Sequence, residues 1–148
     1  MCCDVSGKME HSTDPETGEA QLVWVYEPDE RPKKKHRWGN ADAGFVDVGG
    51  VPVGKCPSDM TLLEAQDLLQ SGIPWSPRGW RHSYPKRLYA VYRGVLYRAT
   101  PTNPGRSYHG FPEHPSHFPT GSRALKDEIL KRARADGCEA EVREWMNW

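Results

Sequence analysis

This 148-residue chain contains no long apolar run, and none of its stretches approaches the roughly 18 apolar residues of a membrane-spanning helix. Hydrophobic residues make up 36% of the chain and charged residues 27%, which is typical of a globular protein. The first residues lack the basic segment followed by an apolar segment that marks a secretory signal. We therefore expect a cytoplasmic protein with no membrane partner.

The sequence also lacks any C-x-x-C pair. Its four cysteines are Cys2, Cys3, Cys56 and Cys138. Two adjacent cysteines followed by long gaps match neither the disulfide framework of a small secreted domain nor a structural zinc pattern. We expect reduced thiols, with Cys56 and Cys138 as small core residues. We predict no cofactor and no metal.

Acidic residues are absent from the segment 68–112, which carries seven bases, whereas residues 1–67 carry 13 acids and 7 bases. Six of the seven bases are arginine, which suits two-pronged contact with phosphate or carboxylate. Aromatic residues are interspersed among them and could stack on nucleobases. This pattern predicts RNA or another phosphate-bearing ligand as a partner. Alternatively, the acidic first third of the chain covers the basic middle third and neutralises it.

Hydrophobic periodicity predicts an α+β fold, in which a polar tail over 1–19 precedes a single domain over 20–148. Helices are expected over 61–71, where Thr61 and Glu64 form a capping box, and over 122–136. A third element over 139–147 is a helix or a terminal strand. Strands are expected over 20–26 and in a short hairpin around Gly49-Gly50.

A second hairpin over 88–100, turning at Arg93-Gly94, is the clearest strand signal. Alternation along its second strand places Val95, Tyr97 and Ala99 on one face, and Leu96, Arg98 and Thr100 on the other. We expect Tyr97 in the core and Arg98 pointing outward. The stretch from Pro101 to Pro119 is expected to be a loop.

The segment that follows this hairpin is the best candidate for chemistry, because loops after strands often carry functional sites. His109 would transfer protons, Arg98 and Arg106 would hold an anionic group, and Tyr108 would stack or donate. The two nearby arginines would disfavour the imidazolium form of His109 and keep it available as a base. Further binding residues are Arg78, Arg81, Arg87, Arg93, Thr100, Asn103 and Ser107.

Two other interpretations of the segment stay open. His109, His114 and His117, with Glu113, could ligate a metal, but histidines spaced on a proline-rich loop form a weak pattern. In a purely structural interpretation Tyr108 packs, His109 makes a local hydrogen bond and the arginines face solvent.

These features favour a protein directed at nucleic acid or nucleotides, such as a small metal-independent ribonuclease-like enzyme with its surface over 78–109. The size and the Arg/Tyr/His content resemble small bacterial effector or toxin domains that act on RNA or nucleotides, although no specific motif carries the resemblance. The alternative is a non-catalytic protein-interaction module of the immunity or adaptor type. It would dock another protein through the Trp-rich loop over 73–86 and through the terminal segment Trp145–Trp148.

Overall fold

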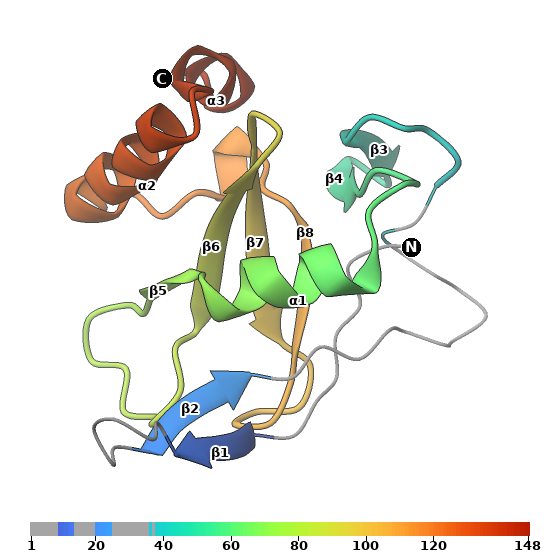
Figure 1. The fold of residues 1–148 in the computed structure, drawn as a ribbon. Helices are drawn as coiled ribbons and strands as arrows, with labels where there is room; N and C mark the ends of the chain where they lie inside the picture. Colours follow the sequence, from blue (N-terminus) through green and yellow to red (C-terminus); the bar gives the residue numbers. More distant parts are fainter. Residues whose placement is uncertain (1–8, 14–19, 25–35, 37) are drawn as a thin grey trace.

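The computed structural model describes residues 9–13, 20–24, 36 and 38–148, and it has an α+β architecture (Figure 1). The strands are β1 (Met9–Thr13), β2 (Ala20–Trp24), β3 (Gly44–Val48), β4 (Val51–Lys55), β5 (Ile73–Trp75), β6 (Arg87–Tyr92), β7 (Val95–Pro101) and β8 (Tyr108–Pro112). The helices are α1 (Leu62–Gln70), α2 (Arg123–Ala135) and α3 (Glu139–Met146), with a 3₁₀ turn η1 (Pro115–His117). None of the helices in this described part combines the length and apolar character needed to cross a lipid bilayer.

The main sheet is antiparallel and has the order β5-β6-β7-β8. Its central hairpin, β6–β7, confirms the hairpin predicted over 88–100. Arg93 and Gly94 form the turn, with φ of 50° and 76°. Left-handed conformations at both central residues match the right-handed twist of the flanking strands, as in type I′ turns.

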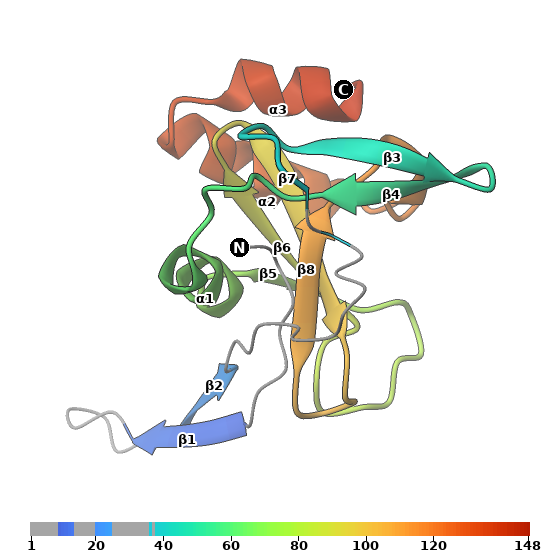
Figure 2. The same ribbon diagram turned by 90° about the vertical axis from the view of Figure 1, so that its right-hand side faces the viewer.

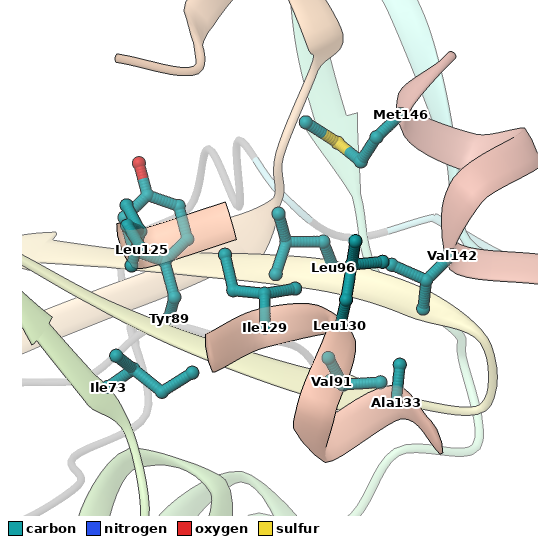
Figure 3. Packing of buried hydrophobic residues seen from close by; sticks show 10 residues of the cluster. All are labelled: Ile73, Tyr89, Val91, Leu96, Leu125, Ile129, Leu130, Ala133, Val142 and Met146. Carbon is teal, nitrogen blue, oxygen red and sulfur yellow. The ribbon is translucent and has the colours of Figure 1, made fainter. Parts of the chain in front are cut away.

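Alternation along the strands divides the apolar side chains between the two faces of the sheet. On one face, α1 contributes Leu69 to a cluster with Leu88, Ala99 and Tyr108. On the other face, side chains from the sheet pack against α2 and α3, as Figure 3 shows. The members of this second cluster are Ile73, Tyr89, Val91, Leu96, Leu125, Ile129, Leu130, Ala133, Val142 and Met146. The helices predicted over 61–71, 122–136 and 139–147 are therefore all present, and each buries one side.

A local sequence signal accounts for the start of α1. Thr61 Oγ1 accepts a hydrogen bond from the Glu64 amide at 3.2 Å, and the Glu64 carboxylate accepts one from the Thr61 amide at 2.7 Å. This reciprocal pair satisfies two amide groups that would otherwise lack partners at the start of the helix. The other carboxylate oxygen of Glu64 accepts a 2.7 Å hydrogen bond from the Tyr92 hydroxyl, which ties α1 to the sheet.

The small hairpin β3–β4 lies against the end of β8, on the edge of the main sheet (Figure 2). A Cβ atom at Gly54 would lie 2.6 Å from the carbonyl oxygen of Pro112, so only glycine permits this approach. The hairpin turns at Gly49 and Gly50, with φ of 63° and 83°, as the sequence predicts.

Several sequence-based expectations need correction. Residues 108–112 form β8 rather than part of a loop, and residues 9–13 of the expected tail form β1, paired with β2. The rest of that tail lies outside the described residues. Arg98 does not point into solvent: its side chain is only 13% exposed. Cys56 is buried but disulfide-bonded rather than reduced, whereas Cys138 has a free thiol.

The capping box makes the stability of the fold depend on pH. The Thr61 amide, with help from the Tyr92 and Thr61 hydroxyls, lowers the pKa of Glu64 from 4.5 to about 2. A carboxylate with a lowered folded-state pKa stabilises the fold above pH 4.5, and this contribution is lost as the pH falls from about 4.5 to about 2. We expect Glu64→Gln to lower the free energy of unfolding at pH 7 by about 1 kcal/mol. Urea denaturation should show the difference shrinking below pH 4.5; an equal difference at pH 2.5 and pH 7 would contradict this role.

Candidate functional site

The face of the sheet that packs on α2 and α3 carries polar and aromatic side chains beyond the apolar cluster. In the register of the sheet, Arg98 of β7 lies between Tyr89 of β6 and Phe111 of β8. One step further along, Thr100 pairs with His109. Because side chains alternate between faces, these residues all project from the same face. The sequence-predicted residues Arg98, Thr100 and His109 are thereby brought together.

The buried carboxylate of Glu113 contacts the polar side chains of this face. The Glu113 side chain is fully buried, and its Oε2 accepts a 2.9 Å hydrogen bond from the Tyr89 hydroxyl. The Arg98 guanidinium lies 3.6 Å from Oε1, and the Arg87 guanidinium lies 3.8 Å from Oε2. Arg87 also donates to the Tyr89 hydroxyl at 3.0 Å and to the His117 carbonyl at 2.9 Å. Two cations from adjacent strands thus share one carboxylate.

The Arg98 guanidinium is the central group of the site. It lies over the Phe111 ring, 4.7 Å from the ring centroid, which is a cation–π arrangement. Its Nε is buried and has no hydrogen-bond acceptor in the described part of the chain. Burial lowers the pKa of Arg98, and the nearby Arg87 lowers it further, while Glu113 opposes both. A buried donor without an acceptor is costly, so the ion pair with Glu113 and the contact with Phe111 hold this guanidinium in place.

Two cavities meet at Arg98 and Phe111, which line both. The first, here called the outer cavity, has a volume of about 400 Å³. It is lined by Trp80, Tyr84, Lys86, Arg87, Arg98, Thr100, Pro101, Pro104 and Phe111. The second, here called the histidine cavity, has a volume of about 200 Å³. It is lined by His36, Phe45, Val51, Pro52, Val53, Gly54, Arg98, His109, Phe111, Pro112, His114 and His117. Among the described residues, neither lining contains an aspartate or a glutamate.

His109 is held on both sides by hydroxyl groups. Its Nδ1 lies 2.8 Å from Thr102 Oγ1, and its Nε2 lies 3.2 Å from Thr100 Oγ1. A hydroxyl can accept or donate a hydrogen bond, so this ring can carry a proton on one nitrogen or on both. The threonine pair fixes the orientation of the imidazole at the wall of the histidine cavity.

His117, at the end of η1, is a second histidine of this cavity. Its ring lies 5.7 Å from that of His114. Burial lowers the pKa of His117 from 6.5; Arg98, His114 and Arg87 lower it further, and Glu113 opposes them. The neutral imidazole therefore predominates at neutral pH, which is the form that accepts a proton. At His117 burial is the main cause of the lowered pKa, and Arg98 adds to it.

The stacked rings of His36 and Phe111 form another wall of the histidine cavity. Their centroids are 4.4 Å apart with an interplanar angle of 12°, and His36 Nδ1 lies 2.8 Å from the Gly54 carbonyl oxygen. Although four histidines line this cavity, no three His, Cys, Asp or Glu side chains of the described residues gather closely enough to hold a metal ion.

Several of the predicted site residues lie elsewhere. Tyr108 is fully buried on the opposite face, under α1, and its hydroxyl donates to the Pro85 carbonyl at 2.6 Å. Ser107 is buried in the β7–β8 turn, where its Oγ accepts from the Asn103 amide at 2.9 Å. Arg93 forms an ion pair with Asp59 at 2.9 Å, at the other end of the β6–β7 hairpin. We therefore leave Tyr108, Ser107 and Arg93 out of the site.

The remaining predicted residues are exposed around the outer cavity and do not line it. Arg106 and Asn103 belong to the β7–β8 turn, and Arg78 and Arg81 belong to the loop before β6. They could contact a ligand that extends beyond the cavity. Arg87, by contrast, lies within it.

Sequence reasoning missed Glu113 and Phe111, although one pattern could have revealed them. If β8 is recognised as a strand, His109, Phe111 and Glu113 alternate onto the same face, and Glu113 is the first acid after the long acid-free segment. The position of His117 follows from η1, which has no comparable signal in the sequence.

Comparison with protein-family models, curated proteins and solved structures finds no match to this chain.

The Tyr89–Glu113 hydrogen bond should contribute more to stability than a similar bond at the surface. We expect Tyr89→Phe to lower the free energy of unfolding by about 1.5–3 kcal/mol, because a buried carboxylate loses a donor. Tyr92→Phe is a matched control, since it removes a 2.7 Å hydrogen bond to the partly exposed Glu64, and it should cost less. Equal costs in urea denaturation would contradict the importance assigned to the buried carboxylate.

Proposed function

We propose that this chain is a ribonuclease-like protein that binds a phosphodiester of single-stranded RNA at Arg98. The observation that carries the proposal is the Arg98 guanidinium, which lines two cavities and whose buried Nε has no acceptor among the described residues. Phosphate would bind the part of Arg98 that lines the cavities, and arginine is the residue best suited to hold phosphate through two parallel hydrogen bonds.

The balance of charge around Arg98 supports an anionic ligand. Arg87 and Arg98 share the single carboxylate of Glu113, and Lys86 adds a further cation to the outer cavity. Among the described residues, three cations therefore face one buried anion, which leaves an excess of positive charge where the cavities meet. Phosphate groups are attracted to such a site, and the attraction weakens as salt is added.

The histidines supply the proton transfers that RNA cleavage requires. In the proposed reaction, neutral His117 accepts the proton of the ribose 2′-hydroxyl, and the resulting oxygen nucleophile attacks the adjacent phosphorus. Arg98 stabilises the negative charge that develops on the phosphoryl oxygens. His109, protonated on both nitrogens, releases the 3.2 Å hydrogen bond between Nε2 and Thr100 Oγ1 and donates the Nε2 proton to the departing 5′-oxygen. The products are a 2′,3′-cyclic phosphate and a 5′-hydroxyl, and the two histidines exchange protonation states.

The rival function, a protein-interaction module, has one specific observation in its favour. Val46, Val48 and Val51 on the β3–β4 hairpin are 40%, 60% and 53% exposed. The tryptophans give it less support: the indole N–H groups of Trp80 and Trp145 donate within the chain, to the carbonyl groups of Tyr84 and Glu113. Salt dependence separates the two functions, because apolar docking lacks the steep electrostatic response.

Binding of a short single-stranded RNA should depend on Arg98 and on salt. We expect Arg98→Lys to weaken binding about tenfold or more, because a lysine keeps the charge near Glu113 but loses the planar pair of donors. Arg93→Lys is the control, since Arg93 is ion-paired far from the cavities. The logarithm of affinity should fall with the logarithm of salt by roughly 0.7 per phosphate contact. Fluorescence anisotropy measures both, and equal effects of the two substitutions would overturn the assignment.

Cleavage should depend on His117. In the pH profile of kcat/KM, the fall on the acidic side should lie below the ordinary pKa of histidine. We expect His117→Ala to lower the cleavage rate about 10²- to 10⁴-fold while leaving RNA affinity nearly unchanged. Because burial and Arg98 lower the pKa of His117, kcat/KM should stay high at pH 6.5 and fall only at more acidic pH. Removing the cation in Arg98→Gln should move this fall to higher pH.

The matched substrate for this measurement is the same oligonucleotide with 2′-deoxyribose, which cannot form the cyclic phosphate and should stay intact. Cleavage of the DNA strand at the rate of the RNA would contradict the proposed reaction. Absence of cleavage together with salt-sensitive RNA binding would refute the enzymatic part and leave the binding part standing.

A further inference from the structure

The outer cavity has aromatic walls that phosphate binding does not use. Trp80 and Tyr84 come from the loop before β6, and Phe111 comes from β8. The cavity volume of about 400 Å³ lies within the range of small-molecule sites, which is roughly 300–1,000 Å³. A single phosphate would leave most of this space unfilled.

The aromatic wall is held in place by contacts within the protein. The Trp80 indole N–H donates to the Tyr84 carbonyl at 2.7 Å, and the two rings meet edge to face with centroids 5.8 Å apart. A Cβ at Gly105 would lie 3.5 Å from the Tyr84 ring, so this ring packs on the β7–β8 turn. The Lys86 amide donates to Ser76 Oγ at 3.1 Å, which closes the base of the loop. A ligand would therefore meet a preformed wall, which lowers the entropic cost of binding.

We propose that the outer cavity binds the nucleoside adjoining the phosphate held at Arg98, with its base against the ring of Trp80. This inference rests on the proposed function and adds to it the ligand group next to the reacting phosphate. Flat bases stack on aromatic side chains in proteins that bind single-stranded nucleic acid, and cations beside the rings hold the backbone.

Arg98 and Phe111 line both cavities, so a ligand bound at Arg98 can extend into the outer cavity on one side and the histidine cavity on the other. A phosphate at Arg98 can be bonded to a nucleoside in the outer cavity on one side, while its other side faces His109 and His117. An acidic peptide would satisfy Lys86, Arg87 and Arg98 but would not need the ring of Trp80. Dependence on the base therefore distinguishes a nucleotide from other anions.

Calorimetric titration at low salt tests the inference with four probes: inorganic phosphate, ribose 5-phosphate and the nucleoside monophosphates AMP and UMP. We expect at least one nucleotide to bind about five- to 150-fold more tightly than ribose 5-phosphate, which is the range that stacking of one base provides. Trp80→Ala should abolish this preference and leave the affinity for ribose 5-phosphate unchanged. Trp80→Phe, which keeps a ring, should restore most of it, and Trp148→Phe, outside both cavities, should change nothing.

The outcomes separate this inference from the proposed function. Equal affinity of the unaltered protein for nucleotides and for ribose 5-phosphate would overturn the nucleoside site, while phosphate binding at Arg98 would stand. Failure of all four probes to bind would overturn both. A nucleotide preference that persists in Trp80→Ala, with the native fold verified by circular dichroism, would overturn the role of Trp80 and with it the proposed placement of the base.

Discussion

The apolar core and the candidate site share one face of the main sheet, and both depend on the carboxylate of Glu113. It is fully buried and meets the Tyr89 hydroxyl and the guanidinium groups of Arg87 and Arg98. Burying an ion is expensive unless partners of opposite charge and hydrogen bonds compensate it. Glu113 also lies at the end of β8, where its amide donates to the Leu96 carbonyl and its own carbonyl accepts from the Trp145 indole. One residue therefore connects the central strands, the last helix and the cations of the site.

This arrangement explains how cationic side chains can lie beside an apolar cluster. Tyr89 belongs to the core through its ring and to the site through its hydroxyl, so the boundary between them passes through a single side chain. Arg98 is positioned from two directions, by Glu113 on one side and by the ring of Phe111 on the other. A guanidinium restrained in this way loses little further freedom when it binds an anion, which favours recognition of a ligand with fixed geometry.

The parts of the fold that could be predicted are those with local causes. Thr61 and Glu64, three residues apart, indicate the start of α1. Gly49-Gly50 and Arg93-Gly94 indicate the left-handed turns of the two hairpins. β8 was missed because its short run contains Gly110 and Pro112, which are uncommon in strands and suggest a loop. Arg98 and His109 were identified from a chemical pattern alone. Their approach to one another depends on the pairing of β7 with β8, a contact across a turn that periodicity within one strand does not reveal.

The buried cluster around Glu113 also has a consequence for selection in the laboratory. Replacing a buried group of charges by well-packed apolar residues of similar volume is often neutral or stabilising. A library of variants sorted only for resistance to heat or protease would therefore enrich apolar replacements of Glu113, Arg98 and Arg87 together. The most robust members of such a library would keep the four-stranded sheet and lose the cations between the two cavities. In this molecule, selection for stability alone would therefore remove the arginines on which the proposed binding of an anion depends.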